Sequence, residues 1–155
     1  MKKVSVKPIL LDTYLAVIKG SVNSKAFKHL YAETLNKRVD ILKNGKLSCS
    51  FFASSILSSF GLIESIHATV NGTEKDLRAS GWKEIKHLRV GSVLIWEIKS
   101  KKDPHRHIGF YVGDDEAVSN SSNIKVPATH HWTFGWHKNK PRRKVEAIFW
   151  HKKLG

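Results

Sequence analysis

The spacing of the apolar residues changes at Gly81, and this change constrains the fold more than any other feature of the chain. Before Gly81, apolar residues recur every three or four positions, which is the spacing of amphipathic helices. After Gly81, short runs rich in β-branched and aromatic residues alternate with turn sequences, which is typical of strands. Helices followed by a meander of strands predict an α+β domain with an antiparallel sheet, because parallel β-α-β units would need helices between the strands.

The same patterns predict the individual elements. Helices are expected at residues 9–18, 26–42 and 48–61, and in a short segment that begins near Thr73 and ends at Gly81. Strands are expected at residues 82–85, 92–98, 107–112, 116–119, 130–134 and 144–150. We therefore expect N-terminal helices packed on one face of a C-terminal antiparallel sheet of about five or six strands.

Length and charge limit the class of protein. The 155 residues fit a single domain, residues 1–155, in which residues 1–44 form an N-terminal helical part. Lys and Arg number 27 against 13 Asp and Glu, so the net charge is +14. Such a chain attracts polyanions, whether nucleic acid, anionic lipid or a cell-wall polymer, and the charge alone does not choose among them. A single cysteine, Cys49, excludes a disulfide scaffold.

The N-terminus gives no sign of export. A transmembrane helix needs about 20 apolar residues, and no run in the chain approaches that length. The basic start is followed by an apolar run that Asp12 interrupts and Lys19 closes, without a small-residue cleavage site. We expect a cytoplasmic protein that reaches a cell wall only by lysis or by non-classical export.

Two residues are suited to nucleophilic catalysis. Cys49 lies in the first turn of an expected helix, where unpaired backbone N–H groups and the helix dipole favour the thiolate. A lone cysteine is also often a small buried hydrophobic residue. A nucleophilic cysteine needs a base, and His107 opens an expected strand in which Gly109 permits close backbone approach. The pattern indicates a Cys–His site.

Three segments together resemble the NlpC-like family of cysteine peptidases. They are SCSFFA at residues 48–53, LRVGSVLIW at residues 88–96, and HIGFYVG at residues 107–113 with AVSN behind it at residues 117–120. The resemblance covers roughly residues 45–122 and implies a compact papain-like fold that cleaves peptide or amide bonds of bacterial cell-wall peptides. It implies Cys49 as the nucleophile and His107 as the general base. Ser48 and Phe51 stand where the family usually has an acid and a glycine, and a family tyrosine has no counterpart near Lys37.

Two neighbouring residues, Ser119 and Asn120, are alternatives for the residue that orients His107. In the family a His, Asn or Gln on the next strand accepts a hydrogen bond from the imidazole and fixes its tautomer. An uninterrupted register places Ser119 there, whereas a one-residue bulge presents Asn120, whose amide carbonyl is the better acceptor. We expect Asn120, with His130 or His131 in reserve.

These features predict a cysteine hydrolase that cleaves an amide bond through a thioester, without a metal or an organic cofactor. The backbone N–H of Cys49 is expected to contribute to the oxyanion site. Trp132 and Trp136 are expected either to pack in the core or to form an apolar wall for the substrate. We expect a monomer whose partners are a peptide substrate and an anionic cell-wall polymer held by the +14 charge.

Two other functions remain open at this point. A non-catalytic basic module could bind nucleic acid, although the basic residues are spread along the chain and form no nucleic-acid-binding motif. An acyltransferase or amidase that acts on a cytosolic substrate would use the same Cys–His site.

Overall fold

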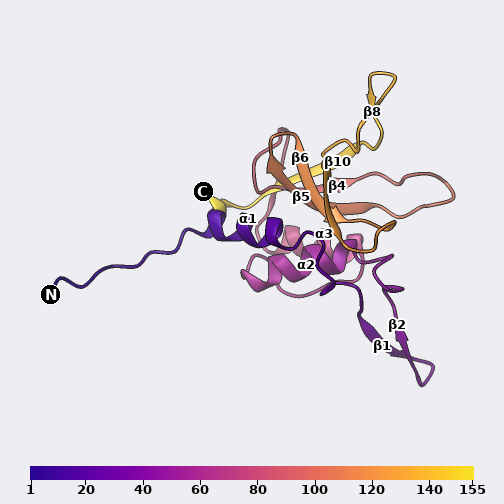
Figure 1. The fold of residues 1–155 in the computed structure, drawn as a ribbon, viewed down its shortest axis with the longest axis horizontal. Helices are drawn as coiled ribbons and strands as arrows, with labels where there is room; N and C mark the ends of the chain where they lie inside the picture. Colours follow the sequence, from indigo (N-terminus) through magenta and orange to yellow (C-terminus); the bar gives the residue numbers. More distant parts are fainter.

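The computed structural model describes residues 1–155 and shows helices packed on one face of an antiparallel sheet (Figure 1). The helices are α1 (Leu10–Gly20), α2 (Cys49–Ser59) and α3 (Val70–Ala79), with a final 3-10 turn, η1 (Lys152–Leu154). The main sheet contains β3 (Lys83–Ile85), β4 (Val93–Trp96), β5 (His107–Gly113), β6 (Glu116–Asn120), β7 (Pro127–His131) and β10 (Val145–Trp150). The predicted α+β class and six-stranded antiparallel sheet are confirmed. No helix is long and apolar enough to cross a bilayer.

The sheet has the strand order β3-β10-β4-β5-β6-β7, and each neighbouring pair is antiparallel. Its central strand β4 is buried on both faces, since alternate side chains point to opposite sides. Val93 and Ile95 join the core with the three helices, whereas Leu94 and Trp96 pack on the opposite face. The helix-facing core also includes the following residues of the three helices: Tyr14, Ile18, Phe52, Ala53, Ile56, Leu57, Val70 and Leu77.

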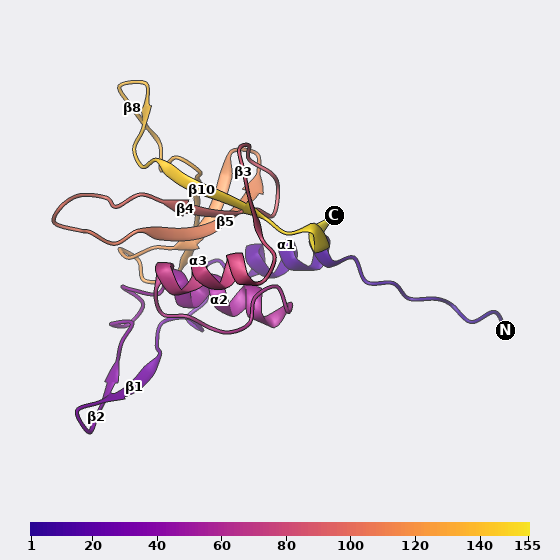
Figure 2. The ribbon, with the colours of Figure 1, turned by 180° about the vertical axis from the view of Figure 1, so that it is seen from behind.

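Two small hairpins project from the body of the fold (Figures 1 and 2). The first pairs β1 (Tyr31–Thr34) with β2 (Lys37–Asp40), and the second pairs β8 (Trp136–His137) with β9 (Lys140–Pro141). The two views also show the loop between β4 and β5 extending on the same side of the molecule as the hairpins.

The first hairpin lies where a helix was predicted, so the prediction for residues 26–42 is wrong. Leu35 and Asn36 both have positive φ values, 50° and 60°, and form the two-residue turn that joins twisted antiparallel strands. Phe27 packs against Phe52 of the core, but the apolar residues of the hairpin have no core to face, since Tyr31 is 54% exposed and Leu35 is 93% exposed. Residues 1–44 therefore hold one helix and a hairpin.

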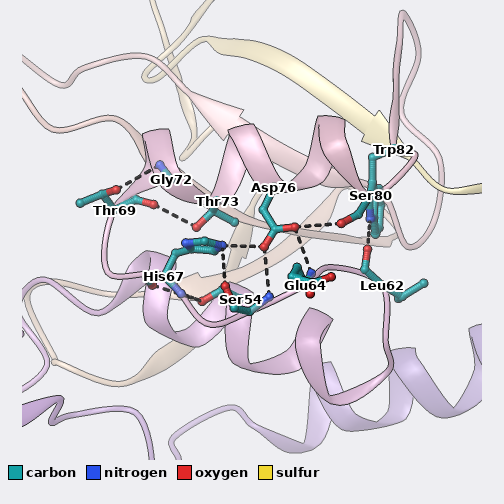
Figure 3. Close-up of polar contacts among 11 residues, drawn as sticks. Ser54, Leu62, Glu64, His67, Thr69, Gly72, Thr73, Asp76, Ser80 and Trp82 are labelled. Atoms are coloured by element: carbon teal, nitrogen blue, oxygen red, sulfur yellow. Dashed lines mark hydrogen bonds and ion pairs between the residues drawn. The ribbon is translucent and has the colours of Figure 1, made fainter.

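A buried carboxylate joins α3 to the loop that precedes it (Figure 3). Asp76 accepts hydrogen bonds from Glu64 N at 3.0 Å, Ser65 N at 3.1 Å, His67 Nε2 at 2.6 Å and Ser80 Oγ at 2.8 Å. We call this group the Asp76 clamp. On the other side of the loop, Ser54 of α2 accepts a hydrogen bond from His67 N at 2.8 Å. The clamp thus fixes α3 against the helix that begins at Cys49.

Two elements have boundaries that differ from the predicted ones. Helix α3 begins at Val70 rather than near Thr73, because the Thr69 side chain accepts from Gly72 N and caps the helix. The expected strand at residues 130–134 is β7, Pro127–His131, and the chain turns after it, with Phe134 at a φ of 60°.

Candidate active site

Helix α2 places Cys49 at its first residue, as the sequence predicted. Its side chains Phe52, Ala53 and Ile56 are buried in the core beneath the sheet. Burial of this face holds the helix, while its N-terminal end opens into a cleft that Cys49 lines. The hydroxyls of Ser48 and Ser50, on either side of Cys49, are buried without a hydrogen-bond partner.

The loop that leads into α2 is docked against the end of β6. Asn120 Nδ2 donates a hydrogen bond to the carbonyl oxygen of Gly45 at 2.8 Å. Gly45 has a φ of 88°, and a Cβ added there would lie 2.4 Å from the carbonyl oxygen of Lys125. No residue other than glycine fits this approach. Asn120 therefore supports the loop that carries Cys49.

The prediction that Asn120 contacts His107 is wrong, because Ser119 occupies that position. His107 opens β5, and its Nε2 lies 2.8 Å from Ser119 Oγ. Gly109 pairs with Ser119 across the two strands, and a Cβ at Gly109 would lie 2.6 Å from Ser119 Cβ. Because Gly109 has no side chain, the two strands approach closely and His107 reaches Ser119. The expected bulge exists, but it lies nearer the turn, between Tyr111 and Gly113, so Asn120 points to the other face.

His130 completes a chain of three side chains. Its Nε2 lies 2.7 Å from Ser119 Oγ, and its Nδ1 lies 2.8 Å from the carbonyl oxygen of His131. The side chain of His131, the other reserve residue, turns instead to Thr133 Oγ1 at 2.6 Å. We refer to His107, Ser119 and His130 as the His107 chain.

The carbonyl at the end of this chain fixes the protons within it. A carbonyl oxygen can only accept, so His130 Nδ1 carries a proton. Burial lowers the pKa of His130, so the ring is neutral near pH 7 and its Nε2 is an acceptor. Ser119 then donates to His130 and accepts from His107 Nε2. Since His107 is also neutral, its Nδ1 is left without a proton and can act as a base.

Aromatic rings cover part of both imidazoles, which are half-buried at the wall of the cleft. Trp96 lies 5.5 Å from the His107 ring and 5.6 Å from the His130 ring, and Phe134 stacks on His130 at 4.0 Å. Burial lowers the pKa of His107 to about 3, and the positive charge of Arg143 and the neighbouring His130 act in the same direction. His107 is therefore a neutral base at physiological pH.

The thiol of Cys49 is protonated in the resting protein. Burial raises its pKa above the ordinary value, although Ser50, the Ile108 backbone and the charge of Arg143 act in the opposite direction. The thiolate preference predicted from the helix start is thus overturned by desolvation. Cys49 and His107 both line the cleft, and no hydrogen bond joins them in the resting structure.

The cleft is large and open, with a volume of ≈ 1840 Å³. Its walls come from the loop before α2, the β4–β5 loop, the β6–β7 loop and the β8–β9 hairpin. Phe134 lines it, whereas Trp132 and Trp136 do not; Trp132 instead lines a separate cavity of ≈ 470 Å³ with Leu88 and Ile148. Neither tryptophan forms the apolar wall of this cleft. Histidine, cysteine and acidic side chains form no cluster suited to a metal ion.

The Asp76 clamp also brings a serine, a histidine and an aspartate together, but these three do not form a catalytic triad. Ser65 Oγ at 3.4 Å and Asp76 Oδ2 at 2.6 Å both approach the same nitrogen of His67, Nε2. A catalytic triad needs the base to meet its nucleophile and its carboxylate through different nitrogens.

Comparisons with known proteins agree with the fold. No protein-family model and no curated protein matches this sequence. Among solved structures, the fold is similar to that of NlpC2 from Trichomonas vaginalis, with a TM-score of 0.56 and 17% sequence identity. The similarity covers 95% of this chain and 48% of that protein, so this chain spans about half the length of NlpC2. At this identity, the similarity shows the fold alone.

Proposed function

We propose that this protein is a cysteine hydrolase that cleaves an amide or peptide bond with Cys49 as nucleophile and His107 as general base. The observation that carries the proposal is the proton order of the His107 chain, which leaves Nδ1 of His107 bare. Both residues line the same cleft. The fold similarity to NlpC2 supports the proposal.

The two neutral groups would react by general-base catalysis, without a preformed thiolate–imidazolium ion pair. As Cys49 Sγ attacks the carbonyl carbon of the substrate, the thiol proton passes to His107 Nδ1. When the C–N bond breaks, His107 donates that proton to the departing amine, and the acyl group stays on Cys49 as a thioester. His107 then takes a proton from water, whose oxygen attacks the thioester. The products are a carboxylic acid, the amine and the regenerated thiol.

The tetrahedral intermediates need donors for their oxyanion. The backbone N–H of Cys49 at the start of α2 is one candidate, and the unpartnered hydroxyl of Ser50 is a second. One such donor stabilises the transition state by about 3 kcal/mol.

We extend the proposal to peptides of the bacterial cell wall. The resemblance of residues 45–122 to NlpC-like peptidases and the fold of NlpC2 both favour this substrate class. The net charge of +14 would concentrate the enzyme on an anionic cell-wall polymer.

The test is digestion of purified peptidoglycan and its soluble peptides, with products identified by mass spectrometry. The wild-type protein should release peptides, and Cys49→Ala and His107→Ala should each lower turnover by about 1000-fold or more. Cys49→Ala should still sediment with the polymer. Raising salt from about 50 mM to about 500 mM should release it.

A nucleic-acid-binding module gives the opposite pattern. It would bind RNA or DNA tightly at low salt, release no product from any amide substrate, and respond to neither Cys49→Ala nor His107→Ala. That result would exclude the hydrolase.

A further inference from the structure

The cleft around Cys49 carries an excess of positive charge. Its acidic lining residue is Asp103, whereas its basic lining residues are Lys43, Lys46, Lys99, Lys102, Arg106, Lys138, Lys140, Arg142 and Arg143. One of these cations is neutralised, because Arg106 contacts Glu74 at 2.6 Å and Glu146 at 3.5 Å. The lysines of the rim are exposed and hydrated.

Arg143 is half-buried like Arg106, but it differs from Arg106 because backbone carbonyls rather than carboxylates hold it. Its Nε donates to the carbonyl oxygen of Glu97 and its Nη2 to that of His105, both at 2.8 Å. Its backbone N–H donates to Thr133 at 3.1 Å. No carboxylate oxygen lies within 4.0 Å of its guanidinium. A guanidinium has five N–H donors, so two carbonyls leave three of them unused.

The charge of Arg143 reaches the two reacting groups. Arg143 Cζ lies 5.9 Å from the centre of the Phe134 ring, and the His107 ring lies 5.7 Å from that same ring, so the guanidinium lies near the base in the cleft. Its charge accordingly lowers the pKa of Cys49 and contributes to the lowered pKa of His107. Asp103 and Glu97 act on the charge of Arg143 from a distance, but no carboxylate pairs with it directly, so a ligand carboxylate could take its free donors.

We propose that Arg143 binds a carboxylate of the substrate next to the amide bond that Cys49 attacks. Two backbone carbonyls fix the plane of its guanidinium, and a planar fork of donors matches a planar carboxylate. The exposed lysines of the rim then attract the acidic substrate, and Arg143 sets its position. This specificity rests on the hydrolase function proposed above.

The sharpest test compares two alkylating reagents that differ in one group. Iodoacetate carries a carboxylate where iodoacetamide carries a neutral amide, and both transfer their carbon to Cys49 Sγ with loss of iodide. Arg143→Gln should lower the ratio of the iodoacetate rate to the iodoacetamide rate about tenfold or more, because the change in thiol pKa slows both reagents alike and cancels in the ratio. Arg143→Lys should give an intermediate loss, because the charge remains but the fork is gone.

Arg89→Gln is the matched control. Arg89 is exposed, donates to the carbonyl oxygen of Gly155 at 3.1 Å and stacks on Trp150, but it does not line the cleft. It should leave the ratio of the two rates unchanged. If Arg143→Gln lowers both rates equally, Arg143 acts only on the β4–β5 loop or on the pKa of the thiol, and the proposal is wrong. An unchanged ratio also refutes it.

A second measurement does not depend on thiol reactivity. Glutarate, titrated into the Cys49→Ala variant, should shift the Arg143 Nε–H resonance saturably, and neutral glutaramide should not. Equal shifts with both compounds, or none with glutarate, refute the carboxylate site. If iodoacetamide fails to modify Cys49 in the native protein, the hydrolase proposal fails instead, and the glutarate titration still decides the role of Arg143.

Discussion

Two histidine clusters in this molecule use similar side chains for different purposes. In the Asp76 clamp, a carboxylate collects four donors, one of them the ring of His67. In the His107 chain, two imidazoles and a hydroxyl end on the backbone carbonyl of His131, without a carboxylate. The acceptor at the end of each cluster accounts for the difference.

A carboxylate holds charge and structure in place. Desolvation raises the pKa of Asp76, but hydrogen bonds from His67, Glu64, Ser80 and Ser65 outweigh it and lower the pKa to about 2. A carbonyl instead fixes the tautomers and adds no charge, so His107 stays neutral and keeps a bare nitrogen. The clamp therefore stabilises the fold, whereas the His107 chain leaves the bare nitrogen that the proposed mechanism requires.

The largest expected effect is on the free energy of unfolding, and it comes from removing the charge of the Asp76 clamp. Asp76→Asn loses an acceptor for buried donors, so it should lower the free energy of unfolding by about 3 kcal/mol in urea denaturation. The folded fraction should still react at Cys49 at the wild-type rate. Asp114→Asn, at an exposed turn, makes the same charge change and should cost little. Equal costs for the two variants would show that the clamp is not a major source of stability.

The next effect concerns the His107 chain. Ser119→Ala removes the hydroxyl that accepts from His107 Nε2, so turnover should fall by about 10- to 100-fold. His130→Ala should have a smaller effect in the same direction, since Ser119 can still accept. Both variants should change the free energy of unfolding by only about 1 kcal/mol. A loss of turnover that merely follows a loss of stability would contradict a role in orienting His107.

The smallest expected effect is a change in the free energy of unfolding at acidic pH. The folded-state pKa of Asp76 lies below its unfolded value, so the clamp stabilises the fold above about pH 4 and loses this contribution as the pH falls toward 2. The stability gap between the wild-type protein and Asp76→Asn should therefore narrow between about pH 5 and pH 2.5. A gap that stays constant over this range would show that the carboxylate is not the group responsible.

The sequence predicted the places of Cys49 and His107 in the fold because local patterns position them. A helix start places Cys49, and a strand start followed by Gly109 places His107. The orienting residue depends on the location of one bulge, which the sequence does not specify. Since the bulge lies near the turn, Ser119 rather than Asn120 shares a face with His107.

Other features depend on tertiary contacts that leave no local signal. The β1–β2 hairpin has apolar residues at helical spacing, and the turn at Leu35 and Asn36 decides its structure. Arg142 and Arg143 are adjacent basic residues in the sequence, and only the carbonyls of Glu97 and His105 distinguish Arg143. The desolvation that protonates Cys49 arises from packing of the whole cleft.

The central claim is that the resting protein holds His107 neutral with a bare Nδ1. Nitrogen-detected NMR of the imidazole rings tests it directly, because protonated and bare nitrogens differ widely in chemical shift. At pH 7 and down to about pH 4, His107 should carry its proton on Nε2 and His130 should carry its proton on Nδ1. A His107 ring protonated on Nδ1, or on both nitrogens at pH 7, would contradict the account.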